Sequence, residues 1–266
     1  MHKAAREAKL RTAWTRPDAG YEDALRRFVE LTLDAAQPAA WWADLQAFAS
    51  RIALFGAWNS LSLTLLKFAS PGVPDVYQGT ELMPLTLVDP DNRRAVDYAC
   101  REDLLEDFER RAAGARSAES VDAFARAPHD GRAKLWFAWR LLALRRAQDA
   151  FFRDAGYRGL RVEGPLARHV VAFERRHEGR TLVVVTARFF AGLCGGVIDE
   201  AAPVLPVGEA WRGTRVWLSD EGTPDARVGF TELLTDAPFE SGRDLDLALL
   251  FARLPWAALW RGAPGD

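Results

Sequence analysis

The feature that most constrains the fold is a long apolar stretch from Ala43 to Phe68. Its apolar residues recur at helical spacing along two seams: Leu54, Trp58, Leu61 and Leu65 on one, and Leu45, Phe48, Ile52 and Phe55 on the other. A helix that is apolar on most sides must be covered by neighbours on most sides. The stretch therefore predicts one long helix buried inside a larger fold.

A break and a short extended segment follow this helix. Ser70-Pro71-Gly72 predicts the helix end, and Val73 to Tyr77, with a proline near its start, predicts a short strand. The polar run Gln78-Gly79-Thr80-Glu81 comes next. A buried helix, a break, a strand and a polar loop form one step of a parallel sheet or α/β barrel, and such loops carry function in barrels.

The rest of the chain divides at about Gly156, where the apolar period changes from 3.6 to 2. Before it, helices are predicted at 21–34, 101–112 and 131–150, with Arg110 to Ser120 as a flexible link. After it, strands are predicted at 168–176, 180–187, 214–218, 245–251 and 256–260. We therefore expect residues 156–266 to form an antiparallel β domain, folded as a sandwich.

Charge and cysteine content exclude several classes of protein. Lys plus Arg total 35 and Asp plus Glu total 37, so no net field favours nucleic acid or an anionic membrane. Cys100 and Cys194 lie far apart with no CxxC spacing, which suits a reducing compartment and predicts a cytoplasmic location. Met1 to Arg11 is basic without an apolar core, and no apolar run approaches the ~20 residues of a membrane span.

Metal signatures fail on spacing. His177-Glu178 is not followed by a second histidine at Thr181, so no HExxH helix exists. The run from Asp89 to Arg94 alternates carboxylates and an amide, but an EF-hand would need glycine where Arg94 stands and glutamate where Cys100 stands. We predict neither a metal nor a cofactor.

The same run, Asp89-Pro90-Asp91-Asn92-Arg93-Arg94, places carboxylates beside guanidinium groups. Such groups can donate to and accept from sugar hydroxyls, or they can pair only to order the loop. Glycoside chemistry by retention requires two carboxyl groups about 5 Å apart. The candidates near the predicted strand end are Asp75, Glu81, Asp89, Asp91 and Asp97. Nothing in the sequence selects two of them, so no catalytic residue is predicted.

Two long runs give the sequence a family resemblance. Ser70 to Leu82 (SPGVPDVYQGTEL) and Leu87 to Tyr98 (LVDPDNRRAVDY) resemble the eighth barrel strand and following loop of maltooligosyltrehalose synthases. These enzymes belong to the α-amylase clan, in glycoside hydrolase family 13. Lys3 to Lys9 and the helix from Arg51 to Leu61 are similar to the same family, so the resemblance covers residues 1 to about 150. It implies that residues 1–155 are the last αβ units of a TIM barrel, including strand eight and its loop.

The resemblance also implies an activity, a site and a partner. Such an enzyme is an isomerase of trehalose biosynthesis: it converts the reducing-end α-1,4 link of a maltooligosaccharide to an α,α-1,1 link, without cofactor. The residues that would line or brace the sugar site are Tyr77, Gln78, Glu81, Asp89, Asp91, Asn92, Arg93 and Arg94. Ala95 stands where the family usually has proline.

The family's catalytic carboxylates lie upstream of the segment with which this chain begins. We therefore expect no activity from the chain alone, and expect the missing N-terminal barrel segment as its partner. A helix-rich half without its barrel should expose much apolar surface, which predicts poor solubility or dependence on a partner.

Two other functions remain open. One is a non-catalytic α-glucan-binding or interaction module. The ten tryptophans would serve there as stacking platforms, with Trp211 and Trp217 as examples, although tryptophan is more often a core residue. The other is a fragment of a different α-amylase-clan enzyme, such as a trehalose-releasing hydrolase, in which the run from Asp89 to Tyr98 would not be expected.

Overall fold

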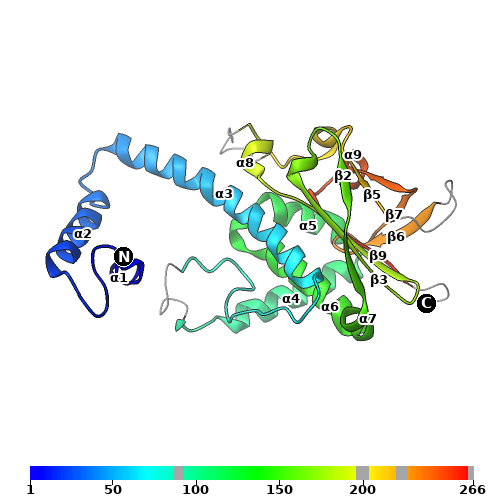
Figure 1. Ribbon diagram of the computed structural model, residues 1–266, viewed down its shortest axis with the longest axis horizontal. Coiled ribbons are helices and arrows are strands. Elements are labelled where there is room, and N and C mark those ends of the chain that lie inside the picture. The colour runs from blue at the N-terminus through cyan, green and yellow to red at the C-terminus, as the bar shows by residue number, and fades with distance from the viewer. Residues whose placement is uncertain (87–92, 196–203, 220–226, 263–266) are drawn as a thin grey trace. The chain divides into compact units, whose positions relative to one another are not determined.

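The computed structural model describes residues 1–86, 93–195, 204–219 and 227–262 (Figure 1). Packing divides the chain into two compact units. The first consists of Met1–Arg51 and Pro84–Ala95, and the second of Ile52–Met83 and Val96–Asp266. One boundary between them therefore falls inside the long helix α3 (Ala39–Ala69). The boundary expected at 155/156 falls within the second unit, where helices and sheet share one core.

The first unit contains α1 (His2–Ala8), α2 (Ala19–Thr32) and the first part of α3. Helix α2, predicted at 21–34, begins where the Asp18 carboxylate accepts a hydrogen bond from the Tyr21 amide at 2.9 Å, as an N-cap does. Its Glu22 side chain is buried and ties the two helices together. It accepts from Arg6 Nε at 2.8 Å and from Thr12 Oγ1 at 2.6 Å.

Helix α3 confirms the long helix predicted from residues 43 to 68. The sequence predicts burial of both of its apolar seams, but only one is buried. Leu54, Trp58, Leu61 and Leu65 are buried. On the other seam, Phe48 is 58% exposed and Ile52 is 52% exposed, because no described residue covers them. Among the residues described, α3 alone has the length and apolar composition to cross a membrane. However, 56% of its most apolar stretch is buried within the protein, and the core helix of a soluble protein has the same length and composition.

The second unit carries the remaining helices. They are α4 (Tyr98–Ala113), α5 (Ser117–Arg126), the 3₁₀ helix η2 (Pro128–Asp130), α6 (Arg132–Ala147) and α7 (Asp149–Asp154). The helices predicted at 101–112 and 131–150 are confirmed by α4 and α6. The link predicted from Arg110 to Ser120 is shorter than predicted: α4 continues to Ala113 and α5 begins at Ser117, because alanine and arginine are good helix formers. Phe108 and Phe124 pack with ring centroids 5.5 Å apart, which holds α4 against α5.

Two antiparallel sheets follow, as predicted for the region after Gly156. The larger has the strand order β1-β3-β4-β9-β6-β7, and the smaller β2-β5-β8. The strands are β1 (Gly156–Gly159), β2 (Arg161–Glu163), β3 (Val170–His177), β4 (Arg180–Ala187), β5 (Arg215–Trp217), β6 (Val228–Glu232), β7 (Ala237–Ser241), β8 (Asp244–Asp246) and β9 (Trp256–Arg261). Two further short helices, α8 (Phe190–Leu193) and α9 (Leu247–Leu250), and the 3₁₀ helices η3 (Ala167–His169) and η4 (Gly208–Trp211) lie between strands.

Most predicted strands are confirmed, with one correction. The β3–β4 hairpin turns at Glu178 and Gly179, which both have positive φ, as a two-residue hairpin turn requires. The strand predicted from Leu245 to Phe251 is shorter. It ends as β8 at Asp246, whose carboxylate accepts from the Ala248 amide at 2.9 Å and starts α9.

Helices and sheet in the second unit are joined by hydrogen bonds buried in a common core. Trp256 Nε1 on β9 donates to Ser62 Oγ on α3 at 2.8 Å, and Ser62 Oγ donates to the Ala187 carbonyl at the end of β4 at 2.8 Å. Trp136 Nε1 on α6 donates to the Leu234 carbonyl at 2.9 Å. The sheet therefore fixes the positions of α3 and α6, and with them the segment that connects α3 to α4.

Candidate functional site

The candidate site is the segment from Ser70 to Met83, which leaves the end of α3 in the second unit. Residues Val73 to Tyr77 do not form the strand that the sequence predicts. A strand needs a neighbour to complete its ladder, and no described residue pairs with this one. Side chains satisfy part of its backbone instead: Lys67 Nζ donates to the Asp75 carbonyl at 3.1 Å.

Arg145 on α6 holds the start of the segment. Its Nη1 donates to the carbonyls of Phe68, at 2.9 Å, and Ser70, at 3.4 Å, and its Nη2 donates to the Gly72 carbonyl. Carbonyls at the C-terminal end of a helix have no partner within the helix, so a guanidinium group there satisfies several of them at once. Burial lowers the pKa of Arg145 from its ordinary value. The end of α3 is thus fixed by a cation from another helix.

A tight turn forms the middle of the segment. The Tyr77 carbonyl accepts from the Thr80 amide at 2.9 Å and from Thr80 Oγ1 at 2.6 Å, and Gly79 has a φ of 86°. Tyr77, 48% exposed, and Gln78 lie on the outside of this turn. The turn therefore presents one phenol and one carboxamide to solvent.

Arg101 on α4 holds the turn in place by hydrogen bonds. Its Nε donates to Glu81 Oε2 at 3.0 Å, its Nη2 to the Gly79 carbonyl at 3.0 Å, and its Nη1 to the Asp97 carbonyl at 2.9 Å. Both side chains of the Arg101–Glu81 pair are largely covered. Glu81, predicted to line or brace the site, is therefore a bracing residue in this arrangement.

The end of the segment is held against the start of α6. Lys134 Nζ donates to the Leu82 carbonyl at 3.0 Å. Gly131 lies so close that a Cβ there would meet Leu82 Cα and the Met83 amide nitrogen, each at 2.9 Å. Only glycine allows this approach. Burial first, and the nearby charge of Lys67 second, lower the pKa of Lys134.

The structure places the predicted site residues in three groups. Tyr77, Gln78 and Glu81 come together on one turn. Arg93 and Arg94 belong to the first unit and are exposed. Asp89, Asp91 and Asn92 lie outside the described residues.

No catalytic pair is evident among the described carboxylates near the turn. Glu81 is paired with Arg101, and Asp97 caps α4 by accepting from the Cys100 amide at 2.9 Å. In the described part of the chain no group of three or more His, Cys, Asp or Glu side chains is placed to hold a metal ion.

Sequence reasoning missed the four cations that hold the segment, Lys67, Arg101, Lys134 and Arg145. The bonds from Lys134 and Arg145 cross 52 and 77 residues of sequence. No local pattern distinguishes these cations from the other basic residues of amphipathic helices. Lys67 lies on α3 itself, whereas the packing of α4 and α6 brings Arg101, Lys134 and Arg145 to the segment.

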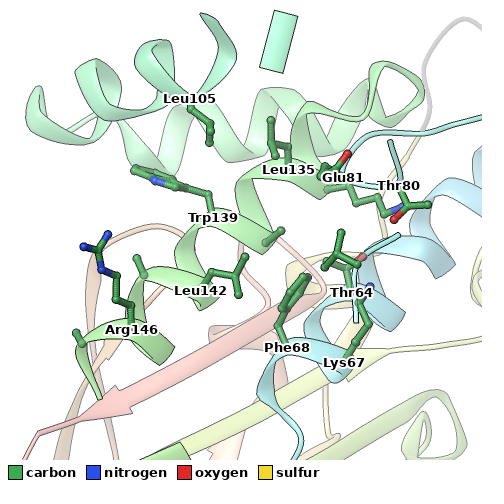
Figure 2. A pocket seen from close by; sticks show the side chains of 15 residues that line it. Thr64, Lys67, Phe68, Thr80, Glu81, Leu105, Leu135, Trp139, Leu142 and Arg146 are labelled. Carbon is green, nitrogen blue, oxygen red and sulfur yellow. The ribbon is translucent and has the colours of Figure 1, made fainter. Parts of the chain in front are cut away.

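A cavity of about 690 Å³ opens beside the segment (Figure 2). All of its lining residues belong to the second unit and come from α3, the segment itself, α4 and α6. Phe68, Leu105, Trp139 and Leu142 surround the middle of the cavity in Figure 2, whereas Thr80 and Glu81 lie at one end. The lining is mainly apolar, unlike the many paired polar groups that a glucan site needs.

Trp211 and Trp217, the two tryptophans proposed as exposed stacking platforms, are both at least partly buried. Trp211 is fully buried and donates to the Pro206 carbonyl, so it cannot stack on a glucan. Trp217 is half-buried; it donates to Glu163 Oε2 at 2.8 Å and carries the Arg161 guanidinium over its ring at 5.1 Å. Trp58, Trp136 and Trp256 are also fully buried. Tryptophan serves mainly as a core residue in the second unit.

Comparison with known proteins gives one consistent relationship. No family model matches the chain. A Mycobacterium tuberculosis protein, provisionally named a maltooligosyl trehalose synthase, is 32% identical over 248 residues, which are 93% of this chain and 27% of that protein. The solved maltooligosyltrehalose synthase of Arthrobacter ramosus is 29% identical, with a TM-score of 0.67 over 97% of this chain and 29% of its own. A further solved maltooligosyl trehalose synthase is 25% identical with a TM-score of 0.61.

The chain thus spans about a quarter of the length of the curated relatives that it matches. Nearly all of it aligns, so the similarity includes the helices, the segment from Ser70 to Met83 and the antiparallel sheets. The resemblance indicated by the sequence is confirmed: the chain is similar to the C-terminal part of maltooligosyltrehalose synthases.

Proposed function

We propose that this chain supplies the C-terminal part of a maltooligosyltrehalose synthase and that its Tyr77–Glu81 turn borders the glucan site. The whole enzyme would convert the reducing-end α-1,4 link of a maltooligosaccharide to an α,α-1,1 link. The observation that carries the proposal is the similarity over 93% of the chain to only 27% of a relative. A chain that matches about a quarter of an enzyme can contribute part of the active site without containing all of it.

The contacts of the turn support a bracing and lining role. Four cations hold the backbone from Phe68 to Leu82, so the turn is rigid even though it is an irregular segment. Tyr77 and Gln78 remain exposed on it. Aromatic rings suit the apolar faces of sugars, and a carboxamide can both donate to and accept from hydroxyl groups. The family resemblance adds Arg93, Arg94, Asp89, Asp91 and Asn92 to the proposed lining.

In this proposal residues 1–155 are the end of a (β/α)₈ barrel, and residues 156–266 are a β-sandwich domain. The Val73–Tyr77 segment would be strand eight, pairing with strands supplied by the rest of the enzyme. That would explain why its backbone has no partner strand among the described residues. The same partner would cover exposed apolar residues of the first unit such as Phe28, at 67%, and Phe48, at 58%. We place the enzyme in the cytoplasm.

The chain alone should not turn over substrate. Retaining glycoside chemistry needs two carboxyl groups about 5 Å apart, and two of the described carboxylates near the turn are engaged, Glu81 in bracing and Asp97 in capping. With maltopentaose, we expect no trehalose-ended product above background by chromatography. Turnover by the purified chain would contradict the proposal.

A chimera tests whether the chain can serve as the C-terminal part of a synthase. Residues 1–266 would replace the matching part of the Arthrobacter ramosus synthase, and folding would be checked by circular dichroism. An active chimera supports the assignment, whereas a folded, inactive one opposes it. Within the chimera, Tyr77→Ala should lower kcat/KM about tenfold, the equivalent of about 1.4 kcal/mol of transition-state binding. Tyr157→Ala, at a tyrosine that is 54% exposed on β1, serves as the matched control and should change kcat/KM less than twofold.

A glucan-binding module is the second candidate. It would require exposed aromatic platforms, and the buried position of Trp211 removes one of the two that the sequence suggested. Trp217 is left as the stacking candidate of that pair.

A further inference from the structure

The cavity beside the Ser70–Met83 segment has the features of a small-molecule site. It measures about 690 Å³ and is concave, mainly apolar, and polar only at specific points. Ligand pockets commonly measure about 300–1,000 Å³ and combine an apolar lining with a few polar groups that fix orientation. Trp139 and Phe68 contribute aromatic rings to the middle of this one (Figure 2).

The charges on the cavity wall are unbalanced. Lys67, Lys134 and Arg146 line it, and Glu81 is the acidic residue that lines it with them. The Glu81 carboxylate is already shared with Arg101, which approaches from α4 at 3.0 Å. The wall therefore carries an excess of positive charge, and an anion entering the cavity would be favoured.

The two ammonium groups also have hydrogen-bonding capacity left. Lys67 Nζ donates to the Asp75 carbonyl, and Lys134 Nζ donates to the Leu82 carbonyl. An ammonium group has three N–H donors, so within the described structure each lysine keeps donors that a ligand oxygen could accept. The positive charge of Lys67 contributes to the lowered pKa of Lys134, as expected for two cations that line the same cavity.

We propose that this cavity binds a small organic acid whose carboxylate lies between Lys67 and Lys134 and whose apolar or aromatic body packs against Phe68, Trp139 and Leu142. A neutral sugar would leave the excess charge uncompensated and would bury hydroxyl groups against apolar side chains, which costs free energy. The cavity shares Thr80 and Glu81 with the turn that we propose borders the glucan site, but binding is measured on the chain alone and does not depend on synthase activity.

The lysines themselves provide a selective probe. The chain has four, Lys3, Lys9, Lys67 and Lys134, so a [¹³C]lysine-labelled sample gives four resolvable ¹³Cε signals. We would titrate the intact chain with 4-phenylbutyrate and, separately, with uncharged 4-phenylbutanol. The acid should shift the Lys67 and Lys134 signals in a saturable way and raise the pKa of Lys134, because a bound carboxylate favours its charged form. The signals of Lys3 and Lys9 are the internal control.

Two variants separate charge from cavity shape. Lys67→Met should weaken binding of the acid at least fivefold and leave that of the alcohol within twofold. Ala143→Trp, at an exposed lining position of α6, should fill the cavity and abolish binding of both compounds while the circular dichroism spectrum stays unchanged.

Four results would overturn the proposal: no shift of Lys67 or Lys134 at saturating acid, equal shifts of all four lysines, equal affinity for acid and alcohol, or unchanged binding by a folded Ala143→Trp variant. A failed synthase chimera would not affect any of these measurements.

Discussion

Gly131 provides the sharpest test of how the candidate segment is held. It precedes α6 with a φ of 78°, and a Cβ there would lie 2.9 Å from both Leu82 Cα and the Met83 amide nitrogen. Alanine at this position must adopt a left-handed backbone and must also push against the main chain of the segment. Neither Leu82 nor Met83 can yield by rotating a side chain, because the crowded atoms include backbone.

The expected cost has two parts. A left-handed conformation costs an L-residue about 1–2 kcal/mol. Overpacking against a well-fixed neighbour costs about 1–3 kcal/mol. Gly131→Ala should therefore lower the free energy of unfolding by about 2–5 kcal/mol. Gly208→Ala is the matched control, since Gly208 also has a positive φ, of 56°, but an added Cβ would meet nothing within 4 Å. It should cost about 1–2 kcal/mol.

Urea unfolding followed by near-ultraviolet circular dichroism measures both variants. The four fully buried tryptophans, Trp58, Trp136, Trp211 and Trp256, all lie in the second unit and report its packing. The Lys134 ¹³Cε signal adds a local readout, because Lys134 Nζ bonds the Leu82 carbonyl. It should shift in Gly131→Ala and stay in place in Gly208→Ala. Equal losses of free energy in the two variants, with an unmoved Lys134 signal, would refute the close contact.

Other predictions follow from the same contacts. Ser62→Ala removes the acceptor of Trp256 Nε1 in the core and should cost about 2 kcal/mol of unfolding free energy, against under about 0.5 kcal/mol for Ser60→Ala. Hydrogen bonds from Arg6 and Thr12 lower the pKa of Glu22 to about 2, below its ordinary 4.5; the stabilisation it gives the first unit is present above pH 4.5 and is lost as pH falls towards 2. The hydrogen-exchange protection factors of residues 2–32, corrected for the intrinsic pH dependence of exchange, should fall over that range, and should fall less in Glu22→Gln. The chain should pass through an amylose column without retention, and Trp217→Ala should behave in the same way. Retention of the parent chain that is lost in Trp217→Ala would instead favour the glucan-binding alternative. The exposed apolar residues of α2 and α3 should make the chain self-associate in light scattering, and a monodisperse monomer would contradict this.

The local elements were largely predictable from sequence. Helices α2, α3, α4 and α6 follow from apolar spacing, because a helix satisfies its backbone within itself and only its apolar face depends on neighbours. The β3–β4 hairpin follows from alternation on both sides of a two-residue turn. The family resemblance rested on a contiguous run of residues and did not require any knowledge of packing.

Tertiary structure decided what the sequence left open. Val73–Tyr77 has the composition of a strand but forms none among the described residues, because a strand is completed by hydrogen bonds from a neighbour. Trp211 and Trp217 look alike in sequence, yet one is fully buried and the other half-buried. The cations that hold the Ser70–Met83 segment, and the unbalanced charge of the cavity beside it, arise where α3, α4 and α6 meet. Interactions that cross 52 to 77 residues depend on the packed core and leave no local pattern in the chain.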